Sequence, residues 1–366
     1  MSAKASAQAL AARQVALDRA RCRARPELLE RKWARMAASP FAFLRGALPV
    51  FDGALRSCAV PPSFTATLVG DLHLENFGVL GLEPGRFLLH VNDFDETRSG
   101  PVAHDVLRLL TSVLLARESL GVDGREVQSL AEAALDGHQK AVSGKRQSPP
   151  SLLVAAVQDA EDGSRTFEKL IDPEARAIRR GPKTPKAPAA LRRAVLEAMP
   201  GHVSRLTDEE RRTLGRLEFL DAAWRVAGTG SLGLTRLVVL AEGRRGALWL
   251  FDVKACPRGA AEVVAALRSA LPAPPFGLGA VQVLGRSMVA RALMPGEAKL
   301  EAQTLRGAEQ RSAIHHLGFL AGQVHARTAT HARRFSAAER RALLELARHL
   351  AGLHHEVFLH FCAAVG

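Results

Sequence analysis

Two short segments of the chain carry side chains that can hold a metal ion and accept a proton. The segments follow two apolar runs, one ending at Val69 and one over residues 87–91, with a Gly/Pro turn at residues 83–85 between them. We therefore expect two strands joined by this turn, which places the side chains at neighbouring loop ends. Carboxylate and amide oxygens in such a cluster suit Mg²⁺, and a carboxylate left off the metal can take a proton from a hydroxyl group. The side chains are Asp71, Asn76, Asp93 and Asp95.

The spacing Asp-x-x-x-x-Asn, followed by Asp-Phe after an apolar strand, resembles the catalytic and metal loops of the protein-kinase-like superfamily. The segment GDLHLEN at residues 70–76 is similar to the GD-x-H-x-x-N motif of the aminoglycoside phosphotransferase and choline kinase branch. This resemblance implies that Asp71 is the catalytic base and that His73 belongs to the catalytic set. It also implies that Asn76 and Asp93 bind metal.

Two further carboxylates belong to this pattern. Asp95 follows Asp93 by two residues, and we expect a second metal ligand there rather than only a cap of the loop. Asp105, in the pattern Gly-Pro-x-x-x-Asp, is implied by the resemblance to be a buried carboxylate that braces the catalytic loop. The alternative for the whole set is an acidic turn pair in an ordinary α/β protein, which the ordered spacing disfavours.

A glycine-rich turn lies far from these loops in the sequence, between strands expected at residues 221–226 and 234–241. Because a strand follows the turn, neither the Rossmann motif nor the Walker motif applies. A third strand, over residues 247–253, ends at Lys254, which is the arrangement that covers phosphates in protein kinases. Glu262, on the helix expected next, is the best candidate to pair with Lys254. The cofactor-binding candidates are Gly228, Gly230, Ser231, Gly233 and Lys254.

The chain most closely resembles DUF2252, a family of bacterial proteins of unknown function. The resemblance runs from about Ser39 to about Arg327 and rests on SPFAFLRG at residues 39–46, GDLHLENFG at residues 70–78 and NDFDET at residues 92–97. The family pattern has Lys-Glu-Ala where this chain has Lys-Ala-Cys after the third strand. The carboxylate partner of the lysine is therefore left open by the motif.

The kinase-like motifs stand in an unusual order, because the catalytic loops precede the glycine-rich strands. We interpret this order as a circular permutation, which compact domains tolerate because their termini often lie close together. The expected fold is α+β and kinase-like with two lobes: residues 1–220 carry the catalytic and metal loops, residues 221–296 form an antiparallel β lobe, and residues 297–366 complete the helical lobe. We expect the C-terminal helices to pack beside the strand at Leu68. Asp123 and Ser336 are expected helix caps.

Composition limits the class of protein. The 366 residues are 47% hydrophobic and 24% charged, typical of a globular protein, and no apolar run is long enough to cross a membrane. The four cysteines are scattered, which favours neither a zinc site nor a disulfide framework, and cytoplasmic localisation is the default. The net charge of +13 makes nucleic acid a possible partner. We do not favour it, because basic residues are not interleaved with aromatic ones.

These observations favour an ATP- and Mg²⁺-dependent, kinase-like phosphotransferase that acts on an unknown hydroxyl acceptor. Transfer of a nucleotidyl group at the same site stays open, because the same residues also allow attack on the α-phosphate. A non-catalytic, nucleotide-binding regulatory module is a second alternative, and a basic nucleic-acid binder is a third.

Overall fold

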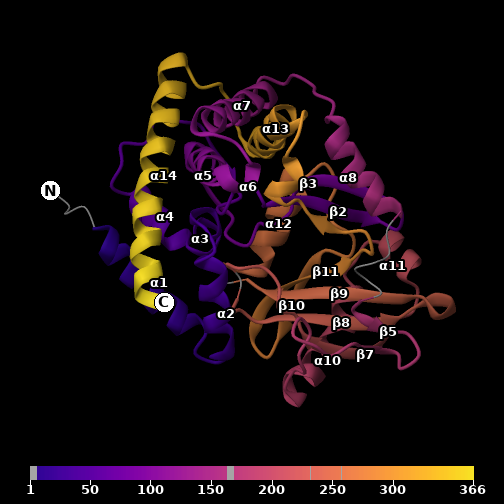
Figure 1. Cartoon of the computed structure of the whole chain (residues 1–366). Helices are drawn as coiled ribbons and strands as arrows, with labels where there is room; N and C mark the ends of the chain where they lie inside the picture. The colour runs from indigo at the N-terminus through magenta and orange to yellow at the C-terminus, as the bar shows by residue number, and fades with distance from the viewer. Residues whose placement is uncertain (1–5, 163–168, 231, 257) are drawn as a thin grey trace.

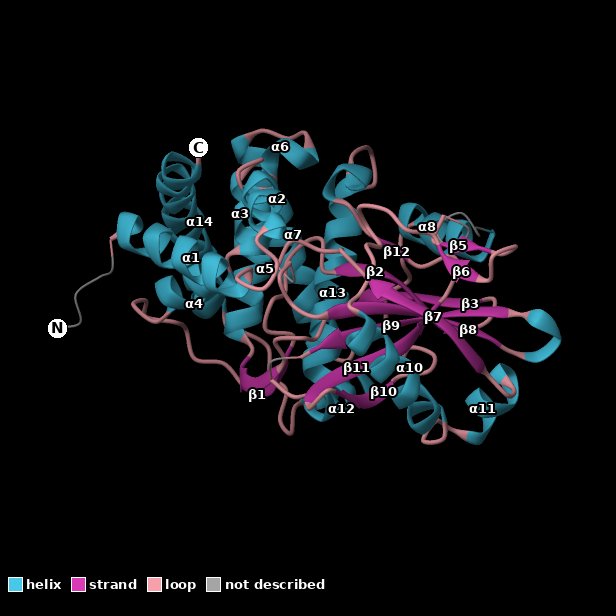
Figure 2. Cartoon of the chain, turned by 90° about the horizontal axis from the view of Figure 1, so that it is seen from below, coloured by secondary structure: helices cyan, strands magenta, loops and turns pink. Residues whose placement is uncertain are grey.

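The computed structural model describes residues 6–162, 169–230, 232–256 and 258–366. Helices gather on one side of the molecule and strands on the other, so that two differently built parts face each other (Figures 1 and 2). The fold is mixed α and β with several small antiparallel sheets. Over the described residues, none of the helices combines the length and the apolar character that a membrane span requires.

The helical side is built from segments at both ends of the sequence. Its two long helices with capping boxes begin where the sequence predicts them, after Asp123 and Ser336. In each box the cap side chain and a glutamate three residues later satisfy backbone N–H groups of the first turn. The helices are α1 (Ala7–Arg21), α2 (Glu27–Met36), α3 (Pro40–Gly46), α4 (Leu48–Leu55), α5 (Ala103–Leu115), α6 (Arg117–Leu120), α7 (Gly124–Val142), α13 (Gln310–Thr328) and α14 (Ala337–Val365).

Glycines allow α7 and α13 to pack closely although they lie far apart in the sequence (Figure 1). A Cβ atom added to Gly318 would come within 1.9 Å of the Ala134 carbonyl oxygen, and one added to Gly137 would come within 1.8 Å of the His315 carbonyl oxygen. No side chain fits at such distances, so the two backbones are in direct contact at these positions.

The strand side is dominated by one antiparallel sheet of five strands in the order β10-β11-β9-β8-β7. Helix α12 (Ala260–Ala270) connects β9 to β10, and α10 (Ala189–Val203) and α11 (Asp208–Leu214) precede β7. The buried apolar residues of the strands pack against α10 and form a second core beside that of the helices. The strands are β7 (Glu218–Trp224), β8 (Arg236–Glu242), β9 (Leu248–Ala255), β10 (Gly279–Val283) and β11 (Arg286–Leu293).

Three small sheets complete the chain. They are β1 (Thr65–Leu68) with β4 (Arg98–Pro101), β12 (Ala298–Lys299) with β2 (Phe77–Glu83) and β3 (Arg86–Val91), and β5 (Ile171–Asp172) with β6 (Ala177–Ile178). Helix α8 (Ser151–Asp162) packs on β2 and β3.

The predicted connection of the two acidic loops was wrong in one respect. The strand at Leu68 does not form the hairpin with residues 87–91; it pairs with β4, and the hairpin is made by β2 and β3. The apolar run after Asn76 supplies β2, and its turn is closed by an Arg86–Glu83 ion pair of 2.6 Å and by the positive φ of Gly85. The polar loops still lie at neighbouring strand ends, because the first residue of β2 faces the last residue of β3.

The expected contact between the C-terminal helices and the strand at Leu68 is present. Helix α13 packs beside β1, and the Thr67 backbone N–H donates to the Thr328 hydroxyl over 3.1 Å. A segment near the C-terminus therefore supports the strand that leads into the first acidic loop.

The close packing of α7 on α13 makes a stability prediction. Gly318→Ala should lower the free energy of unfolding by about 1–3 kcal/mol, because the added methyl group forces the helices apart. Gly352→Ala is the matched control: Gly352 is exposed on α14 with nothing within 4 Å of an added Cβ, so the change should stabilise the helix by about 0.5–1 kcal/mol. Urea unfolding measures both, and equal effects of the two substitutions would contradict the packing argument.

Candidate active site

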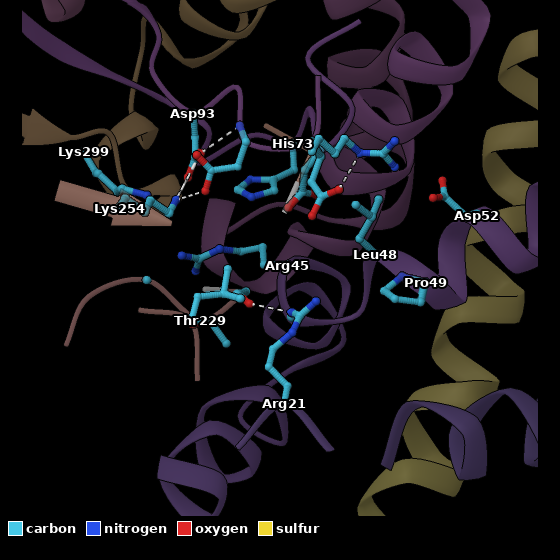
Figure 3. Close-up of a pocket in the computed structure, with 18 of the residues that line it drawn as sticks. Arg21, Arg45, Leu48, Pro49, Asp52, His73, Asp93, Thr229, Lys254 and Lys299 are labelled. Atoms are coloured by element: carbon cyan, nitrogen blue, oxygen red, sulfur yellow. Dashed lines mark hydrogen bonds and ion pairs between the residues drawn. The ribbon is translucent and has the colours of Figure 1, made fainter. Parts of the chain in front are cut away.

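A cavity of about 460 Å³ lies between the acidic loops and the glycine-rich strands (Figure 3). Its walls bring together predicted site residues from two separated parts of the sequence. The acidic loops contribute Asp71, His73, Asp93 and Asp95, and the strand side contributes Gly228, Gly230 and Lys254. Arginines of the N-terminal helices line the opposite wall.

Asn76 ties the two acidic loops together. Its side-chain Nδ2 donates to the backbone carbonyl oxygens of Asp71 and Asp93, over 3.0 and 3.1 Å. The side chain is buried, and its backbone carbonyl accepts a hydrogen bond from Asn92 N–H. Because the nitrogen is used by the loops, Oδ1 is the side-chain atom of Asn76 that is suited to a cation.

Asp105 braces the first acidic loop, as the resemblance implies. Its buried carboxylate accepts hydrogen bonds from the backbone N–H groups of Val69 and Gly70, at 2.7 and 3.0 Å. The His325 ring lies 3.2 Å from the same carboxylate and 2.9 Å from the ring of His138. This buried chain of polar groups connects α7 and α13 to the turn before Asp71.

Asp71 is held by an arginine that the sequence analysis did not identify. Arg108, on α5, is almost completely buried; it donates from Nε to the Asp71 carboxylate over 2.7 Å and from Nη2 to the Leu44 carbonyl oxygen over 2.9 Å. Its guanidinium also lies over the Phe51 ring. Burial raises the pKa of Asp71 to about 6, although Arg108 pulls it down. With 24% of its side chain exposed toward the cavity, Asp71 can accept a proton near neutral pH.

His73 lines the cavity as a neutral donor. Burial, together with the charges of Arg45 and Arg108, lowers the pKa of His73 well below its usual value. Its Nδ1 accepts a hydrogen bond from the Glu75 backbone N–H over 3.2 Å. The proton of the neutral ring is therefore on Nε2, which can donate to a ligand oxygen.

Lys254 joins the two sides of the cavity. Its Nζ lies 3.4 Å from both carboxylate oxygens of Asp93 and forms an ion pair with Asp95 (Figure 3). The suggested partner Glu262 was wrong: it is exposed on α12. The carboxylates that neutralise Lys254 come instead from the acidic loop, 161 residues earlier in the sequence.

The two carboxylates that share Lys254 differ in proton affinity. Burial alone would raise the pKa of Asp93, but Lys254 and Lys299 together hold it below its usual range. Burial and the negative charge of Asp93 raise the pKa of Asp95 to about 6. Asp93 is therefore the carboxylate that stays ionised and available to a cation at all physiological pH values.

One protein family matches a stretch of the chain that contains nearly all residues of the candidate site. A family model described as an uncharacterized protein conserved in bacteria (DUF2252) matches residues 23–364. The chain belongs to the DUF2252 family. No curated protein and no solved structure matches it. The predicted family is thus confirmed, and the kinase-like resemblance stays a prediction.

In this DUF2252 chain, arginines of the helices α1 and α2 form hydrogen bonds with the backbone of the glycine-rich turn. Arg35 donates to the Gly228 carbonyl oxygen and Arg21 to the Gly230 carbonyl oxygen, each over 2.9 Å. Gly228 and Gly233 have positive φ values of 74° and 94°, which other residues rarely adopt. Ser231, also predicted to bind cofactor, lies outside the described residues.

The side chains of the DUF2252 site do not by themselves form a metal centre in the part of the chain that the structure describes. Among the residues that the structure describes, no group of three or more His, Cys, Asp or Glu side chains is arranged to hold a metal ion. Nucleotide sites commonly hold Mg²⁺ through one or two carboxylates and complete the shell with phosphate oxygens and water. Asp93 lines the cavity, whereas Asn76 is buried and is not among the described residues that line it. Both Asp93 and Asp95 pair with Lys254 in this structure.

The raised pKa of Asp71 predicts a pH-dependent effect on stability. Protonated Asp71 is favoured by the folded state, so the parent chain loses stability as the pH rises from about 4 through about 6. Asp71→Asn removes this loss, and the variant should gain about 2–3 kcal/mol relative to the parent across that window. Urea unfolding of both chains between pH 4 and pH 7 measures the difference, and parallel profiles would rule out the raised pKa.

Proposed function

We propose that this DUF2252 chain is a kinase-like phosphotransferase that moves a phosphorus-containing group from ATP, with Mg²⁺, to a hydroxyl acceptor. The observation that carries the proposal is the meeting of Lys254 with Asp93 at one cavity, opposite Asp71 and beside the glycine-rich turn. Positively charged and metal-binding groups on one side and a proton acceptor on the other are the parts that phosphoryl transfer requires.

Each residue has a role in this proposal. Asp71 orients the acceptor hydroxyl and takes its proton, with Arg108 fixing the carboxylate in place. Asp93 and Asn76 hold Mg²⁺, which when bound neutralises charge on the phosphate oxygens. His73 donates from Nε2 to an oxygen of the bound ligand.

Lys254 is poised to exchange partners. Without a nucleotide its ammonium group neutralises Asp93 and Asp95. In the proposed complex Asp93 would hold Mg²⁺, and Lys254 would be free to contact a phosphate oxygen. The ion pair therefore keeps Asp93, the proposed metal ligand, ionised.

The architecture around the cavity supports a circularly permuted kinase-like arrangement. Lys254 lies on β9, the third strand of the antiparallel sheet after β7 and β8, and α12 follows it. In protein kinases the phosphate-binding lysine also lies on the third strand and a helix follows it. Helix α13, from the C-terminal part, supports the loop that carries Asp71. The proposed compartment is the cytoplasm, where ATP is available.

Binding of ATP and Mg²⁺ should stabilise the folded chain. At 100 times the dissociation constant, a ligand that binds only the folded state adds about 2.7 kcal/mol, which raises the melting temperature. The rise should require Mg²⁺ and should be lost in Asp93→Asn and in Lys254→Ala. Glu262→Gln is the matched control and should keep the full rise, since Glu262 does not face the cavity. No rise in the parent at millimolar ATP would remove the nucleotide-site proposal.

A further inference from the structure

The cavity has a wall of arginines on the side of the N-terminal helices. They are Arg13 and Arg21 of α1, Arg45 of α3, and Arg56, which follows α4. Arg21 donates to the glycine-rich turn over 2.9 Å, and Arg45 forms an ion pair of 2.5 Å with Glu75. Among the residues that the structure describes, the side chains of Arg13 and Arg56 have neither a hydrogen-bond acceptor nor a carboxylate partner. These two guanidinium groups are therefore available to a ligand.

The carboxylates of the same cavity do not balance these two charges. Every carboxylate that the structure describes in the lining already has a cationic partner, so the N-terminal wall carries an excess of positive charge. A concave surface with such an excess attracts anions. The pairs are Asp52 with Arg98, Asp71 with Arg108, Asp93 and Asp95 with Lys254, and Glu96 with Arg258.

The two unpaired arginines project from neighbouring helix faces. Helices α1 and α4 pack against each other where Leu10 meets Gly53. A Cβ atom added to Gly53 would lie 3.2 Å from Leu10 Cδ2 and 3.8 Å from Arg56 Nη2, so the Arg56 guanidinium lies beside this contact. Arg13 follows Leu10 by three residues and therefore lies on the same face of α1. Both side chains can reach a single anionic group.

Helix α4 lies on the side of the cavity away from Lys254. In Figure 3, Pro49 and Asp52 of α4 lie on the opposite side of His73 from Lys254. Because Lys254 contacts the nucleotide phosphates in the proposed function, the α4 side is left for the acceptor.

The proposed proton acceptor is fixed to the same side. Arg108 donates to Asp71 over 2.7 Å, and its guanidinium lies over the Phe51 ring of α4. A molecule whose hydroxyl group lies beside Asp71 can therefore extend along α4 to Arg13 and Arg56.

We infer that the acceptor is a small hydroxyl compound that carries its own phosphate monoester group, bound by Arg13 and Arg56. This inference rests on the proposed function. Guanidinium groups bind phosphate oxygens through paired, charge-assisted hydrogen bonds. A phosphate monoester has a charge of about −1.5 to −2 near neutral pH, which matches two unpaired guanidinium groups better than the single charge of a carboxylate does.

The charge of the wall separates this acceptor from those of the enzymes that the GD-x-H-x-x-N motif resembles. Choline and aminoglycosides are hydroxyl compounds that carry positive charge. Two arginines without carboxylate partners would repel such compounds from the α4 side of the cavity.

Inorganic phosphate tests the site without an identified acceptor. It is titrated calorimetrically into the whole chain saturated with Mg²⁺ and the ATP analogue AMP-PNP, so that the nucleotide phosphates already occupy their positions. Arg13→Gln and Arg56→Gln should each weaken phosphate binding about tenfold, because each removes one charge-assisted contact. Both side chains are exposed, so the variants should fold normally. Arg341→Gln, on an exposed position of α14, is the matched control with the same change in net charge and should leave the affinity unchanged.

Two small hydroxyl compounds of opposite charge test the specificity of the same nucleotide-saturated chain. Glycerol 3-phosphate should bind more tightly than inorganic phosphate, because its hydroxyl group can also reach Asp71, and choline should not bind. Tighter binding of choline than of glycerol 3-phosphate would contradict the anionic acceptor.

The outcomes separate this inference from the proposed function. No phosphate binding to the nucleotide-saturated parent, or equal affinity in the parent, Arg13→Gln and Arg56→Gln, would overturn the inference and leave the proposed function standing. An equal loss in Arg341→Gln would also overturn it, because net charge alone would then explain the binding. Failure of Mg²⁺ and AMP-PNP to bind the parent would remove the proposed function and, with it, the assignment of the two arginines to an acceptor.

Discussion

The ion pairs of Lys254 with Asp93 and Asp95 are the contacts on which the arrangement of the cleft depends. They join a sheet strand to a loop 161 residues earlier, and they do so at largely buried positions where an unpaired charge would be costly. The negative charges of the loop raise the pKa of Lys254 above its usual value despite burial. Lysine and carboxylates therefore stabilise each other's ionised forms. Carboxylates concentrated in a cleft need such a cation to stay ionised.

The same contacts separate the roles of neighbouring carboxylates. Asp93 is kept ionised by cations on the sheet side, whereas burial raises the pKa of Asp71 to about 6 even though Arg108 donates to it. One carboxylate thus suits a metal and the other suits proton transfer near neutral pH. The side chains of Asp105 and Asn76 form hydrogen bonds with backbone groups of the two loops. The positions of Asp71 and Asp93 therefore do not depend only on the contacts of their own side chains.

The sequence predicted that the acidic loops lie at neighbouring strand ends, but it did not predict which side chains pair with them. Asp71, Asn76 and Asp93 follow apolar runs at recognisable spacing, and the strand ending at Lys254 was also visible. Strand β2 was missed because its apolar run directly follows the first loop and was not separated from it by a turn signal. Glu262 was chosen for its nearness in sequence, whereas the true partners of Lys254 are distant in sequence. In the sequence, nothing distinguishes Arg108 from other polar residues of a helix. Its role is seen only in the structure, where it donates to Asp71 and to the Leu44 carbonyl oxygen.

The N-terminal helices border the cavity on the side opposite the acidic loops. Arg21 and Arg35 bind carbonyl oxygens of the glycine-rich turn, and a buried Lys32–Asp18 ion pair of 2.6 Å joins α2 to α1. Breaking that buried pair would leave a charge without a partner, so the two helices act as one unit. The turn that borders the cavity is therefore positioned by the first two helices of the expected helical lobe, residues 1–220. The arginines and a small buried apolar cluster of Cys22, Leu28, Val226 and Leu232 together hold the turn, and the same arginines make the outer wall of the cavity cationic.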